Sequence, residues 1–194
     1  MNEFFLVNNR SIVVGDTTIH QLRMHDFDEW FTAAKAVKDY LKTHSDEIDT
    51  RFLKAHISHV LTLLSKSAHL EESALISIAE ASESLLIQLV DAMIKVNDAF
   101  FSEKESKRKR RRKSQSSAGD QISWFDTFQF MIESGHRHED IMQMSYGTFT
   151  GYLKAAQKNH AAKMRVQANL MRAAQHANAK AFTKLIDELK PGED

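Results

Sequence analysis

The chain has 194 residues, with 26 lysines and arginines and 26 aspartates and glutamates, so its formal net charge is zero. It contains no cysteine, which excludes disulfides, a thiolate nucleophile and cysteine-ligated zinc. The apolar run at residues 4–7 is too short for a signal peptide, and no run of about 18 apolar residues could span a bilayer, so the sequence predicts a soluble, cytoplasmic protein that does not enter the membrane.

Strand-forming residues concentrate near the N-terminus. Two β-prone runs, residues 4–7 and 12–14, precede Gly15 and Asp16, which mark a turn before a third short run at residues 17–19. This pattern predicts a small β-hairpin. Because a two-stranded ribbon is only marginally stable by itself, we expect the hairpin to lie on the helices that follow it.

From Asp26 onward the apolar residues recur at helical spacing, and a content of only one proline and six glycines favours a mainly α fold. Asp26 or Asp28 can cap a first helix, and residues 45–47 start a second one. A third helix begins near Glu71 and Glu72, and it either continues to Phe101 or breaks near residue 83. The apolar faces of the first two helices are formed by Trp30, Phe31, Ala34, Val37 and Leu41, and by Ile48, Phe52, Ala55, His59, Leu63 and Leu64.

A basic run then interrupts the helical pattern. It consists of Lys107, Arg108, Lys109, Arg110, Arg111, Arg112 and Lys113. Seven adjacent cations repel one another and have no apolar face, and a serine-rich stretch follows them, so the run is predicted to be a solvated linker. Residues 1–101 have a net charge of −6, residues 102–120 of +5 and residues 121–194 of +1. The sequence thus predicts two small helical domains, at 1–101 with the hairpin and at 121–194, joined by a flexible basic linker at 102–120.

The predicted C-terminal domain contains a series of helices. Ser123 can cap a short aromatic helix that ends at Gly135, and a second short helix covers residues 138–144. Thr148 opens a long amphipathic helix, and a last segment follows at residues 181–189. The apolar positions of the long helix include Met164 and Met171, but alanine occupies many others. Since alanine buries little area, this half is expected to gain stability from a neighbour.

No motif of catalysis or of cofactor binding is present. The sequence lacks a nucleophile elbow, a phosphate-binding glycine loop and a dinucleotide fingerprint. His136, His138 and Glu139, and the pair His56 and His59, are the candidate metal ligands, but zinc requires three or four converging ligands and no cysteine can complete a set. The sequence therefore predicts a protein without enzymatic activity, cofactor or metal.

Two other surfaces are candidates for binding. Aromatic residues at the ends of the predicted domains and along the first helices of the second one are candidate interface anchors, although ordinary core packing explains them equally well. They are Phe100, Phe101, Trp124, Phe125, Phe128, Phe149 and Tyr152. The basic run, residues 107–113, could contact nucleic acid through phosphates, but it lacks interleaved aromatic residues and a rigid scaffold, so such binding would be non-specific and is not favoured.

The layout resembles that of the tail assembly chaperones of long-tailed bacteriophages. The C-terminal half carries the best match, with Trp124-Phe125-Asp126-x-Phe128, then Gly135-His136, then Glu139-Asp140-Ile141-Met142, and then Thr148-Phe149 opening a helix with Tyr152-Leu153-x-Ala155-Ala156. In the N-terminal half, Ile19-x-x-Leu22 followed by Asp28-x-x-x-Thr32-Ala33-Ala34 is similar to the strand-to-helix entry of the family. The strongly basic linker departs from the family pattern.

This resemblance implies a helical N-terminal domain joined by a linker to a short C-terminal domain, in an extended form commonly made by translational frameshifting. It implies a non-enzymatic role in the host cytoplasm: the first domain would coat apolar helices of the tape-measure protein, and the second would recruit subunits of the major tail tube protein. Such a chaperone needs exchangeable apolar surface on a charged scaffold, and self-association into homo-oligomers is a further expectation.

Overall fold

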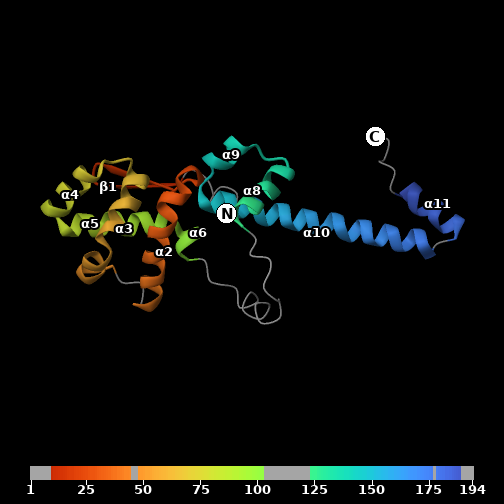
Figure 1. Ribbon diagram of the computed structural model, residues 1–194, viewed down its shortest axis with the longest axis horizontal. Coiled ribbons are helices and arrows are strands. Elements are labelled where there is room, and N and C mark those ends of the chain that lie inside the picture. The colour runs from red at the N-terminus through yellow and green to blue at the C-terminus, as the bar shows by residue number, and fades with distance from the viewer. Residues whose placement is uncertain (1–9, 45–47, 103–122, 177, 189–194) are drawn as a thin grey trace. The chain divides into compact units, whose positions relative to one another are not determined.

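The computed structural model describes residues 10–44, 48–102, 123–176 and 178–188. These residues form helices and one two-stranded antiparallel sheet, which confirms the predicted mainly α fold (Figure 1). The chain divides into two units, a first unit of residues 1–152 and a second unit of residues 153–194. Apart from Ser102, the predicted linker at 102–120 lies outside the described residues.

The predicted hairpin is confirmed. Strand β1 (Ser11–Val14) pairs antiparallel with β2 (Thr17–His20), with Ile12 opposite Ile19. Gly15 has a φ of 58° in the turn, a conformation that glycine adopts without a steric cost. Ile19 is fully buried, and both strands lie against α5, as expected for a ribbon that needs a helical support. The apolar run at residues 4–7 lies outside the described residues.

Three helices build the body beneath the hairpin. A single 3₁₀ turn, η1 (Met24–Asp26), leads into α2 (Phe27–Thr43), which packs against α3 (Thr50–Ala68). Asp49 caps α3 by accepting a hydrogen bond from the Phe52 N–H at 2.8 Å. Asp26 precedes α2 without a side-chain capping bond, because its carboxylate instead lies 3.4 Å from Lys66 Nζ. The buried residues of α2 and α3 include Trp30, Ala34, Val37 and Leu41, and Phe52, Leu63 and Leu64, as their spacing predicted.

The third predicted helix is broken close to residue 83. Helix α4 (Glu72–Ala81) ends before Ser82, whose extended backbone (φ −158°, ψ 101°) separates it from α5 (Glu83–Val96). The Ser82 hydroxyl accepts a hydrogen bond from the Leu85 N–H at 3.3 Å and so caps α5. A short helix, α6 (Asp98–Phe101), follows. The apolar circumference of α5 is explained by its central place, with α3, α4 and the hairpin packed around it.

Residues 123–152 pack into the same unit as the N-terminal helices. The Met24 N–H donates to the Met144 carbonyl at 2.9 Å, and the Tyr146 N–H donates to the Leu22 carbonyl at 3.3 Å. The division of the chain therefore falls at 152/153, whereas the sequence placed a domain boundary at the linker. The physical reason is that a charged run keeps itself in solvent but does not prevent the segments on its two sides from packing together.

The C-terminal helices begin and end within two residues of their predicted positions, wherever the sequence indicates such a position. Ser123 and Asp126 form a capping box at α8 (Trp124–Glu133), and Gly135 follows with a φ of 99°. Helix α9 (His138–Gln143) precedes α10 (Tyr146–His176), which begins two residues before the expected Thr148. Asn178 caps the last helix, α11 (Ala179–Glu188), by accepting a hydrogen bond from the Ala181 N–H at 2.9 Å.

Replacing Phe149 tests whether residues 123–152 stabilise the first unit. Phe149 is fully buried, so Phe149→Ala is expected to lower the free energy of unfolding of this unit by about 3–5 kcal/mol. Urea unfolding followed by tryptophan fluorescence measures this, because Trp30 is buried in the same unit. Phe125→Ala is the matched control, since Phe125 is 70% exposed, and it should change stability by less than about 0.5 kcal/mol. Equal effects of the two substitutions would contradict the packing.

Candidate partner-binding surface

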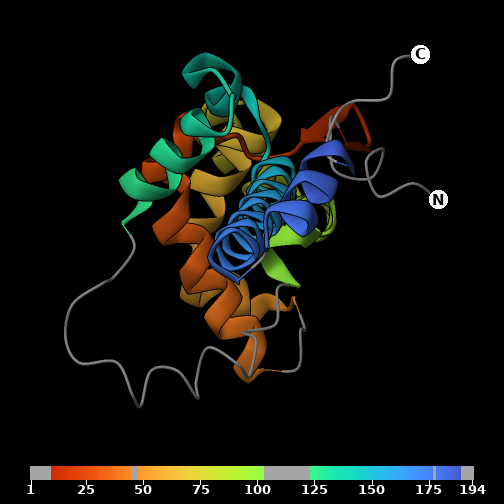
Figure 2. The ribbon, with the colours of Figure 1, turned by 90° about the vertical axis from the view of Figure 1, so that its right-hand side faces the viewer.

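Aromatic side chains from both sides of the basic run meet in one cluster, which we call the aromatic cluster. Its members are Phe27, Trp30, Phe31, Phe100, Trp124, Tyr146 and Phe149. The ring centroids of Trp124 and Phe27 are 4.5 Å apart, and those of Phe100 and Tyr146 are 5.0 Å apart. Helices α2 and α8 accordingly lie side by side (Figure 2). These edge-to-face and tilted contacts add to the free energy of burial.

The cluster explains where most of the candidate anchors lie. Phe100 and Phe149 are buried in it, with Lys38 Nζ 4.7 Å from the centroid of the Phe100 ring. Phe101, Phe128 and Tyr152 are half-buried. Their neighbours are Phe100, Phe149 and His136, at ring distances of 5.3, 5.3 and 5.1 Å respectively. Burial leaves two of the seven candidates open to solvent on α8: Phe125, and Trp124, which is 40% exposed.

Phe125 belongs to an outward apolar face of α8. Ile132 lies seven residues further along the helix, close to two turns, so both side chains project from one side. Both are exposed, whereas Met131 on the inner side is fully buried. The helix therefore buries one apolar face and leaves a second one open.

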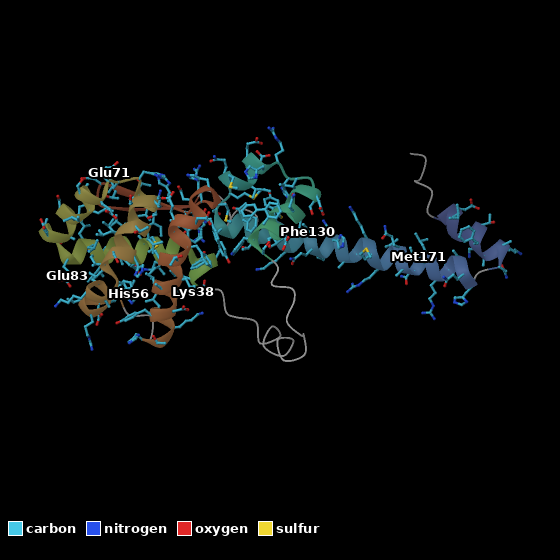
Figure 3. All side chains as sticks on the ribbon, viewed as in Figure 1. Lys38, His56, Glu71, Glu83, Phe130 and Met171 are labelled. Carbon is cyan, nitrogen blue, oxygen red and sulfur yellow. The ribbon has the colours of Figure 1, made fainter. Side chains whose placement is uncertain are left out.

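The second unit exposes more apolar side chains. Met164, Val166 and Met171 on α10 are exposed, as are Phe182 and Ile186 on α11. Met171, which is 67% exposed, projects away from its helix (Figure 3). The residues of α10 that are buried all lie in its first turn: Tyr146, Thr148 and Phe149. The described part of residues 153–188 thus consists of helices with apolar side chains that the monomer does not cover.

The same helix carries charge of only one sign. Helix α10 has five cations and no acidic residue. Every one of these cations is exposed: Lys154, Lys158, Lys163, Arg165 and Arg172. The sequence analysis missed this because it summed the charge over residues 121–194, where acidic residues near both ends bring the net to +1. A count per helix would have found it.

The histidine pair of α3 lies close together, with no third potential metal ligand beside it in the described part of the chain. The rings of His56 and His59 are 5.7 Å apart, and the Nδ1 atom of each is buried without a hydrogen-bond partner. Nowhere in residues 10–44, 48–102, 123–176 and 178–188 do three potential metal ligands converge. Burial lowers the pKa of His56, and the neighbouring His59 and His44 lower it further. The backbone also departs from helical geometry at His56 (φ −129°, ψ 19°).

A small polar cavity of about 290 Å³ lies beside the hairpin. Its lining comprises Arg10, Ser11, His20, Gln21, Arg23, Gln143 and Ser145. A carboxylate is absent from this lining, so the cavity does not contain a paired acid and base. Its volume is at the lower end of the range for small-molecule sites.

In the part of the chain that the structure describes, we find no helix with the length and apolar character needed to cross a bilayer. The basic run at 107–113 lies outside that part. Comparison of the chain with protein-family models, with curated proteins and with solved structures finds no match.

The half-buried His56 makes acid sensitivity a testable property. The pKa of folded His56 lies below its ordinary value of 6.5, so the unfolded chain takes up this proton at a higher pH than the folded chain. The free energy of unfolding should therefore fall as the pH drops below 6.5. Urea midpoints measured between about pH 7 and pH 5 should fall less for His56→Gln than for the wild type. His138→Gln, at an exposed position, is the control, and an equal fall in all three proteins would refute the assignment.

Proposed function

We propose that this protein is a non-enzymatic tail assembly chaperone of a long-tailed bacteriophage. In this role it binds and solubilises the tape-measure protein in the host cytoplasm and recruits subunits of the major tail tube protein. The observation that carries the proposal is that α10 and α11 expose several large apolar side chains: Met164, Val166, Met171, Phe182 and Ile186. The sequence resemblance described above supports the role, but it assigns the tape-measure protein to the predicted first domain, whereas we assign it to α10 and α11.

This surface suits a partner made of long amphipathic helices. Apolar side chains on a helix bind the apolar stripe of another helix, and the partner then no longer exposes that stripe to water. Methionine is flexible and polarisable, so Met164 and Met171 can adapt to many different sequences along a long partner. The alanines beside them, such as Ala161 and Ala168, allow a second helix to approach closely.

The second open surface, Phe125 and Ile132 on α8, offers a separate place for a different partner. A chaperone that brings two proteins together needs two surfaces that can be occupied at once. The two surfaces can be distinguished by substituting one while measuring the partner of the other.

Polar substitutions on α10 and α11 test the proposal. Met164→Ser, Met171→Ser and Phe182→Ser remove exposed apolar contacts, and together they should weaken binding of the tape-measure protein by about tenfold or more. The measurement is the soluble fraction of a tape-measure protein co-expressed with each variant. Val13→Ser is the control, because Val13 is 66% exposed on β1, outside this surface. A tape-measure protein that stays as insoluble with the wild-type chain as without it would refute the proposal.

Non-specific nucleic-acid binding is the second candidate function. The observation in its favour is that no acidic residue occurs between Asp140 and Asp187, a stretch that holds seven cations, in addition to the basic run at 107–113. Salt distinguishes the two functions. Six or more phosphate contacts would cost about 10³-fold in affinity between roughly 50 and 200 mM salt, whereas binding through apolar helix faces should change little. Binding of a labelled oligonucleotide and of a tape-measure segment over this salt range measures the difference.

A further inference from the structure

Four of the five cations of α10 lie along one side of the helix. Lys154, Lys158, Arg165 and Arg172 follow one another at spacings of four, seven and seven residues, which places them within about 40° of one another around the axis. Lys163 lies on the opposite side. We call the four residues the cationic row. Within the described residues, none of the four has an ion-pair partner.

Small and apolar residues run beside the cationic row. Ala161 and Ala168 come next to it around the helix, followed by Met164 and Met171. All four of these residues are exposed. The surface is therefore a shallow strip of alanine with positive charge along one edge and methionine along the other.

The first unit carries a surface of the opposite charge on α4. No lysine or arginine occurs between Lys66 and Lys95, and this stretch holds five acidic residues. Glu72, Ile76 and Glu80 recur every four residues of α4 and form one exposed ridge, which we call the acidic ridge. Ile76 is 45% exposed, whereas Leu75 on the inner side is fully buried. Glu71 and Glu83 flank the helix at its two ends and add to the negative charge (Figure 3).

The two surfaces match in length as well as in charge. Glu72 and Glu80 are eight residues apart, about 12 Å along the axis of α4. Lys158 and Arg165, and likewise Arg165 and Arg172, are seven residues apart, about 10–11 Å along α10. A helix that places its two glutamates against two successive cations brings the isoleucine between them onto the alanine strip, and leaves the methionines at the far edge uncovered.

We propose that the acidic ridge of one copy of this chain binds the cationic row of a second copy. Each copy carries both surfaces at different places, so the contact is heterologous and can continue from one copy to the next. A second copy fits the observations better than nucleic acid, because the row is bordered by an apolar strip that phosphates would leave uncovered. The inference concerns two copies of this chain and does not rest on the tape-measure proposal.

The contact has the properties of an exposed electrostatic interface. Its ion pairs are accessible to water and to salt, so each is individually weak, and the association should be reversible and lose strength as salt is added. Placing charges of the same sign opposite one another makes such an interface unfavourable. Reversing the charge of either surface should therefore separate the copies, and reversing both should join them again.

Charge reversal with the full chain tests the proposal. Sedimentation velocity over a concentration series should show reversible association of the wild type that weakens between about 50 and 500 mM salt. The double variants Glu72→Lys with Glu80→Lys, and Arg165→Glu with Arg172→Glu, should each associate at least about tenfold more weakly than the wild type. An equimolar mixture of the two variants should associate again, because each then offers the other an oppositely charged surface.

Lys163→Glu is the matched control for the single variant Arg165→Glu, since it makes the same change of charge on the opposite side of α10; it should leave the association intact, whereas Arg165→Glu should weaken it. Circular dichroism establishes that the variants remain folded, as expected for exposed positions. The proposal is overturned if the wild type stays monomeric, if charge reversal leaves association unchanged, or if the mixed variants stay apart. It is also overturned if the variant Arg165→Glu with Arg172→Glu loses binding to an oligonucleotide but still self-associates like the wild type, because the cationic row would then be a phosphate site.

Discussion

The first unit depends on the aromatic cluster built around Trp30. This indole is fully buried, donates from Nε1 to the Arg23 carbonyl at 2.8 Å, and contacts Phe27, Phe100 and Tyr146. These neighbours come from both sides of the basic run, so burial of one indole joins two distant parts of the chain. The hydrogen bonds between Met24 and Met144 and between Leu22 and Tyr146 then fix the register of the two segments. The cluster also takes up the first turn of α10, where the buried residues of that helix lie.

Local structure was largely predictable, because its causes are local. The turn at Gly15 and the cap at Ser123 each follow from a few adjacent residues, and each was predicted from them. The break near residue 83 was one of two alternatives that the sequence left open. The packing of residues 123–152 was not predictable in the same way. Helical periodicity shows that Phe149 has a buried side, but it does not identify the partner that buries it. The basic run suggested two separate bodies because charge repulsion is visible in a sequence and long-range packing is not.

The sequence did not show which aromatic residues of the predicted interface are exposed. Aromatic residues at helix ends were reasonable candidates. Whether such a residue belongs to the core or is free to bind a partner depends on what packs over it. The structure buries Phe100 and Phe149 and exposes Phe125. On α10 the reverse holds: Met164 and Met171 have the spacing of a core stripe and are exposed. The abundance of alanine in α10 was the sequence signal for this exposure. Alanine buries little area, so a helix rich in alanine gains little stability from packing into a core.

The zero net charge of the chain conceals a separation of charge that has its own consequence. A protein with acidic residues concentrated around α4 and α5 and cations along α10 has little overall repulsion between copies, while it has strong local fields of both signs. Overall neutrality at a sequence pI near 7.2 favours association between copies. Because the two signs of charge are separated along the chain, the acidic surface of one copy is expected to face the basic surface of the next. The proposed chaperone role would gain from this arrangement, because weak contacts between neighbouring copies would raise the effective concentration of each copy on a long partner and still release it when the partner assembles. Strong apolar contacts between copies would bury the same exposed methionines that the partner needs. Charge on one edge of α10 and methionine on the other therefore allow self-association and partner binding to use different sides of one helix.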